Sequence, residues 1–190
     1  MSNETTEDDT DELEHGIDVE LSERELLCIG KIIALWATIE YEIFCQTLKS
    51  FDVSDISELP KEMNNMQFSK VLTLWQTRVA SNGEGKRKDV LQQQYKRILH
   101  FSNFRNALVH GMWDWSKAVP AKITAIRIRK KEMQRTHFTA EDLESFVSEL
   151  QRINFKVRYP GGGDDYANAL AKQGSYRARL SGAGPLLASR

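Results

Sequence analysis

The sequence predicts a mainly α-helical domain, a bundle of four to five helices with a small β hairpin or arm before the last helix. Three stretches, near residues 22–50, 68–79 and 143–157, repeat apolar side chains at the spacing of one helix face. A fourth stretch, residues 126–129, alternates Ile and Arg with the period of a half-buried strand. The 190 residues fit one domain with enough chain to bury a core.

The first predicted helix begins at Ser22, which can form a capping box with Glu25 three residues later. Its apolar positions cover more than a single stripe, because Ile32, Leu35 and Ile39 add to the main face. Such a helix is expected to be central or to lie at an interface. Residues 51–65, which are interrupted by Asp, Ser and Pro, indicate a connecting loop.

The later elements follow from the same signals. A second helix is predicted from Phe68 to about Val79, ended by the polar, glycine-containing segment 81–85. A third is predicted from about Lys86 to His110, before Gly111, where we expect a left-handed residue. After a hairpin or arm over 121–137, Thr139 and Asp142 are expected to cap the last helix. That helix carries the stripe Leu143, Phe146, Val147, Leu150, Ile153 and Val157.

The two ends of the chain differ from this domain, which we place at residues 21–158. Residues 1–20 hold nine of the 27 acidic residues and no Lys or Arg, so we expect a disordered acidic tail. The other 170 residues carry 18 acidic and 26 basic side chains, a net charge of +8 that favours an anionic partner. Residues 159–190 are expected to be irregular and disordered.

Polar residues interrupt the apolar pattern at the end of the third predicted helix. Arg105 falls on the same helical face as Leu91 and Ile98, whereas Asn106 and His110, four residues apart, lie on its flank. Because a buried guanidinium needs a partner, and Glu40 lies on the midline of the first helix's apolar face, we expect Glu40 and Arg105 to meet. A histidine in the last turn suits general acid or base catalysis, and the alternative is an exposed capping histidine.

The segment from Arg105 to His110 resembles the Arg-x4-6-His motif of the HEPN family, small α-helical domains whose active members are metal-independent ribonucleases. The resemblance covers the order of elements from about 22 to 157, and the segment from Trp36 to Glu40 is similar to the first helix of a HEPN subgroup. It implies a homodimer in which Arg105, Asn106 and His110 of both protomers form one composite site that cleaves RNA by 2′-hydroxyl attack, supported by Glu40. It also implies a toxin or defence role, with a cognate antitoxin protein as a partner.

Basic residues of the predicted hairpin are candidates for contacts with RNA phosphates. They are Lys122, Arg127, Arg129, Lys130, Lys131 and Arg135, and the alternative is a solvated hairpin face. Trp113 and Trp115 could stack on bases, although a Trp beside a helix end belongs more often to the core.

The sequence predicts no cofactor and no metal, because its four histidines and two cysteines show no ligand spacing. With no signal peptide and no membrane-spanning apolar run, the expected compartment is the reducing cytoplasm. The first functional prediction is therefore a metal-independent endoribonuclease. The alternative is a non-catalytic HEPN-like module that binds RNA, a nucleotide or a protein, with Arg105 and Glu40 as a structural pair. An outward His110 at a dimer seam would favour the enzyme, and burial would favour the module.

Overall fold

The computed structural model describes residues 21–52, 59–64, 66–115, 122–129 and 131–180. The predicted acidic tail and Lys130 therefore lie outside the described residues. Within them the fold is mainly helical with one small antiparallel sheet, as the sequence predicts. The helices are α1 (Glu23–Lys49), α2 (Phe68–Trp75), α3 (Gly85–His110), α4 (Ala140–Arg158) and α5 (Gly163–Leu180). The strands are β1 (Met112–Trp115), β2 (Ile123–Arg129) and β3 (Glu132–Phe138).

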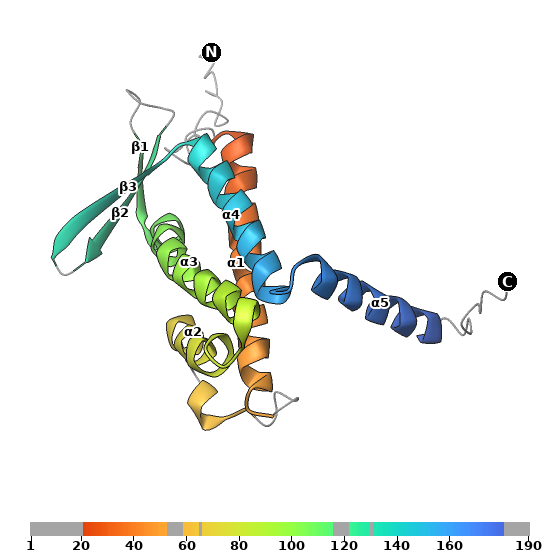
Figure 1. Cartoon of the computed structure of the whole chain (residues 1–190). Coiled ribbons are helices and arrows are strands. Elements are labelled where there is room, and N and C mark those ends of the chain that lie inside the picture. Colours follow the sequence, from red (N-terminus) through yellow and green to blue (C-terminus); the bar gives the residue numbers. More distant parts are fainter. Residues whose placement is uncertain (1–20, 53–58, 65, 116–121, 130, 181–190) are drawn as a thin grey trace, which may run out of the picture.

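Helices α1 and α4 lie side by side, α3 runs obliquely to them and contacts α4, and α2 lies beside the C-terminal half of α1 (Figure 1). A 3-10 turn, η2 (Lys61–Met63), precedes α2, and a π-helical turn, η3 (Gln76–Ala80), continues it. The sheet begins directly after α3 and projects away from the helices, and the chain returns from β3 into α4 (Figure 1). No helix in the described part of the chain is both long and apolar enough to cross a membrane.

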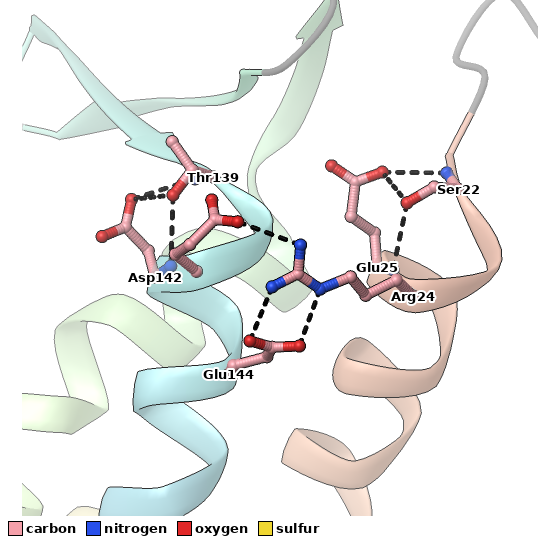
Figure 2. Close-up of polar contacts among 7 residues, drawn as sticks. Ser22, Arg24, Glu25, Thr139, Asp142 and Glu144 are labelled. Atoms are coloured by element: carbon pink, nitrogen blue, oxygen red, sulfur yellow. Dashed lines mark hydrogen bonds and ion pairs between the residues drawn. The ribbon is translucent and has the colours of Figure 1, made fainter.

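The N-termini of α1 and α4 are capped in the same way and joined by one arginine (Figure 2). Both predicted capping boxes are confirmed, Ser22 with Glu25 and Thr139 with Asp142. Between them, Arg24 donates from Nε and Nη2 to the carboxylate of Glu144, each at 2.7 Å, and from Nη1 to Glu141 at 2.9 Å. These charge-assisted bonds set the two helix starts at the same level of the bundle.

The core lies between α1, α2, α3 and α4. The largest fully buried side chains include Ile32, Ile39, Ile43, Leu72, Trp75, Ile98, Leu108, Leu143, Leu150 and Ile153, and thus come from all four helices. Gln46 links three of them, because its side chain accepts from the Trp75 indole at 2.9 Å and donates to the Val157 carbonyl at 3.0 Å. The amphipathic stripes predicted for α1, α2 and α4 therefore face one another.

The sheet has the order β1-β2-β3 with antiparallel pairing throughout. The hairpin prediction is confirmed, but the alternating isoleucines do not face the core. Ile123 and Ala125 are buried, and Arg127 shares their face by alternation, whereas Ile128 is 67% exposed. The small Ala125 side chain permits the end of α3 to approach this face, and this contact fixes which face is inward.

The prediction of an irregular segment after α4 is wrong for Gly163–Leu180, which form α5. Several alanines and one acidic first turn favour this helix. Asp165 holds its start by accepting from the Gly161 N–H at 2.7 Å and from Arg87 at 2.8 Å. Residues 181–190 lie outside the described part of the chain.

Candidate active site at the end of α3

The last turn of α3 ends abruptly at Gly111, one residue before β1 begins. Gly111 is not left-handed, contrary to the prediction: its φ of −74° and ψ of 152° are extended. The glycine is required by close approach instead, since a Cβ would lie 2.3 Å from the Ala107 carbonyl oxygen and 3.0 Å from Ala125 Cβ. The Trp113 indole N–H donates to the Leu108 carbonyl at 2.9 Å and satisfies one open acceptor of the helix end. Trp113 is thus structural.

The three motif residues predicted as catalytic are brought together on this turn. Arg105 Nη1 donates to Asn106 Oδ1 at 3.1 Å and lies 3.1 Å from His110 Nε2. Arg105 and Asn106 are half-buried, and His110 is exposed. Arg105 is therefore at the margin of the core, and the apolar centre of α3 is formed by Leu91, Ile98 and Leu108. Val109, which shares the helical face of Leu91 and Ile98, is 37% exposed.

The contact with Arg105 assigns a tautomer to His110. A guanidinium has only donors, so a hydrogen bond from Nη1 requires a lone pair on Nε2 and places the imidazole proton on Nδ1. Asn106 accepts from Arg105 and therefore holds the guanidinium. The arrangement presents a base and a cation within one hydrogen bond of each other.

Glu40 faces the same site but does not pair with Arg105. Its Oε1 accepts from the Trp36 indole N–H at 2.7 Å, and the ion pairs of the described residues include none between Glu40 and Arg105. The Arg105 guanidinium lies 5.8 Å from the centre of the Trp36 ring, at the outer limit of a cation–π contact. Trp36 therefore contacts Glu40 and lies near Arg105, and the two charged groups line the same cavity without forming an ion pair.

A cavity of about 490 Å³ opens beside these residues, and we call it the motif cavity. Its wall includes Trp36 and Glu40 from α1, Arg105 and His110 from α3, and Arg127 from β2. The segment that opens α2 completes the wall with Gln67, Phe68 and Ser69, none of which was predicted as a site residue. Phe68 packs edge-on against Trp36, with ring centres 6.0 Å apart. Nothing local marks these α2 residues, because only helix packing brings them here.

Of the basic residues predicted to bind RNA, Arg127 alone among those with described side chains lines the motif cavity. Lys122, Lys131 and Arg135 are exposed along the projecting strands and their turn. The side chains of Trp115 and Arg129, and the whole of Lys130, lie outside the described part. The described side chains of the hairpin therefore contribute one cation, Arg127, to the site.

The described residues contain no group of three or more His, Cys, Asp or Glu side chains that could hold a metal ion. The chain matches no family model, no curated protein and no solved structure.

Proposed function

We propose that this protein is a metal-independent endoribonuclease of the HEPN type, in which two copies of the chain bring two Arg105–His110 pairs to one composite site. The observation that carries the proposal is the 3.1 Å contact between a guanidinium and an imidazole nitrogen that keeps its lone pair. It lies at a cavity of about 490 Å³ whose wall holds a second arginine, Arg127. Arginine suits a phosphate, and an exposed imidazole suits proton transfer.

In the proposed reaction, Nε2 of one His110 accepts the proton of an RNA 2′-hydroxyl, whose oxygen attacks the adjacent phosphorus. The protonated His110 of the second protomer donates to the departing 5′-oxygen. The products then end in a 2′,3′-cyclic phosphate and a 5′-hydroxyl. Arg105 stabilises the charge on the five-coordinate phosphorus, and its movement to the phosphate releases Nε2 for the first step.

The exposed face of α1 supports a dimer beside this site. Leu26, Gly30, Ile33, Ala37 and Tyr41 follow one another at helical spacing, and all five are exposed. Leu26 is 54%, Ile33 49% and Tyr41 68% exposed, an apolar stripe of the kind that marks an interface. Seven residues separate Ile33 from Glu40, so the two differ by only about 20° around the helix. A second copy on this stripe would therefore adjoin the motif cavity.

The test is cleavage of mixed single-stranded RNA by the purified protein in excess chelator. His110→Ala should reduce the rate at least about 100-fold, because general acid and base catalysis contribute that much or more. Arg105→Lys should also reduce it, since it keeps the charge and loses the planar fork. Gln93→Ala, an exposed change on the same helix, is the control. Products with a plain 3′-hydroxyl, or cleavage unchanged in His110→Ala, would exclude the mechanism.

A non-catalytic module that binds RNA or a nucleotide is the second candidate. The observation in its favour is that Arg105 and Arg127 line one cavity and would hold a phosphate whether or not His110 moves a proton. Wild-type protein that binds RNA tightly and leaves it intact in chelator, with binding lost in Arg105→Ala, would favour this candidate over the enzyme.

A further inference from the structure

A second hollow lies between α3, the end of β3 and the start of α4, and encloses about 260 Å³. We call it the aromatic pocket, because its wall includes the rings of His100, Phe101, Phe104, His137, Phe138 and Phe146. Phe101 stacks on Phe146, with ring centres 5.2 Å apart and planes 20° apart. Phe146 and Phe138 are buried, so they form the floor.

Three rings of the aromatic pocket remain accessible, those of His100, Phe104 and His137. Phe104 is 37% exposed, and its ring meets His100 edge-on with centres 5.3 Å apart. His137 is also exposed, and the Thr124 hydroxyl lies 2.9 Å from its Nδ1, so the ring is held with Nε2 free. An open aromatic face beside a fixed imidazole is suited to stacking against a flat ring.

The polar groups of the pocket favour a ligand that donates hydrogen bonds. Asp142 and Glu149 place two carboxylates in its wall. The N–H and hydroxyl of Thr139 both bond to the Asp142 carboxylate and hold its pKa below the usual range, so the group is anionic near neutral pH. Ser145 adds a hydroxyl. Glu149 is paired with Arg97 and Arg152, whereas the described ion pairs include none of Asp142. Because Thr139 bonds to Oδ2 of Asp142, its Oδ1 can accept a hydrogen bond from a ring N–H or an amino group.

The aromatic pocket and the motif cavity are linked by shared residues. Phe104 lines both the aromatic pocket and a third hollow of about 290 Å³, and Arg127 lines both that hollow and the motif cavity. The three hollows thus follow one another along the foot of the sheet. Phe104 and His110 are six residues apart on α3, about 9 Å along its axis.

We infer that the aromatic pocket binds one nucleobase of a single-stranded RNA whose backbone passes Arg127 to reach Arg105 and His110. The inference rests on the proposed function and adds to it the substrate class, an unpaired strand with a base bearing an amino or imino N–H. A base in a duplex is stacked and cannot enter, whereas a base in a single strand can turn out to stack on an aromatic ring. Phe104 is the stacking residue, and Arg127 neutralises the phosphate between the two sites.

The experiment uses the full chain and single-stranded 2′-O-methyl oligoribonucleotides of mixed sequence, which lack the attacking hydroxyl and are not cleaved. Each carries one abasic nucleotide, moved along the strand, and binding is measured by fluorescence anisotropy. One abasic position should weaken binding to wild type about five- to 100-fold, and Phe104→Ala should weaken binding of the intact strand by a similar factor. When the abasic strand is combined with Phe104→Ala, the affinity should fall no further than with either change alone.

Phe155→Ala is the matched control, because Phe155 is an exposed ring of a helix face, 41% accessible, in an aromatic cluster with Tyr159 and Tyr166. It should leave binding unchanged. Phe104→Trp should retain binding and Phe104→Leu should not, which separates stacking from packing.

Three results would overturn the inference. They are affinity losses that multiply when the two changes are combined, an unchanged affinity in Phe104→Ala, and no binding of any strand. If the protein cleaves RNA but the abasic position and Phe104→Ala are not coupled, only the base-binding role of the aromatic pocket is refuted. If the two changes are coupled but no RNA is cleaved, the proposed ribonuclease activity is refuted and the base-binding pocket stands.

Discussion

Substitution of Gly111 by alanine tests the junction that holds His110 in place. The added Cβ would lie 2.3 Å from the Ala107 carbonyl oxygen, more than 1 Å inside ordinary contact, and 3.0 Å from the fully buried Ala125. The backbone must shift, which weakens the 2.9 Å bond from Gly111 N–H to Ala107, worth about 1 kcal/mol. Overpacking against Ala125 adds about 1–3 kcal/mol, so the expected loss of unfolding free energy is about 2–4 kcal/mol.

Urea denaturation followed by circular dichroism measures this loss as a lower midpoint with an unchanged slope. Gly163→Ala is the control, because nothing lies within 4 Å of its added Cβ. Gly111→Asn separates two explanations. If the position required a left-handed backbone, asparagine would destabilise the fold less than alanine, because asparagine tolerates that conformation. If close approach is the cause, asparagine should destabilise the fold at least as much as alanine. Alanine within about 0.5 kcal/mol of wild type, the usual range for uncritical surface changes, would refute the reasoning.

Three further predictions follow from the described contacts. Ile33→Glu on the exposed face of α1 should give a folded monomer in analytical ultracentrifugation, whereas Lys31→Glu, on the polar side of the same helix, should remain a dimer. A dimer of Ile33→Glu would show that the interface does not include this face. The pKa of the Asp142 carboxyl in the folded protein lies below its usual 3.8, chiefly because the Thr139 N–H bonds to it. Its contribution to stability is therefore complete above pH 3.8 and is lost as the pH falls through the lowered pKa. Asp142→Asn should therefore flatten the acid limb of a stability curve, and an unchanged limb would contradict the capping role. Glu40→Ala should cost about 1.5–3 kcal/mol in thermal unfolding, the value of one hydrogen bond to a charged acceptor, and a larger loss would indicate the ion pair with Arg105 after all.

The helices, their starts and the hairpin could be predicted from the sequence because their signals are local. The capping box of Ser22 and that of Thr139 need only residues three positions apart, and an apolar stripe needs only neighbours within a few turns. The same locality brought Arg105, Asn106 and His110 together, since consecutive turns of one helix fix their spacing. The missed helix α5 follows the segment Pro160 to Gly163, whose proline and three glycines indicate a chain break, and its alanines are interspersed with polar residues.

Tertiary packing decided which of these groups meet. A helical wheel gives the direction of Glu40 and of Arg105, but the offset between α1 and α3 determines that Glu40 bonds to Trp36 and not to Arg105. The inward face of β2 carries Ile123 and Ala125, whose small side chain lets the end of α3 approach, whereas Ile128 on the other face is exposed. The aromatic pocket joins α3, β3 and α4 across more than 30 positions of the chain. Contacts of this kind depend on interhelical distances set by the volumes of all the core side chains together, a property that no single stretch of sequence carries.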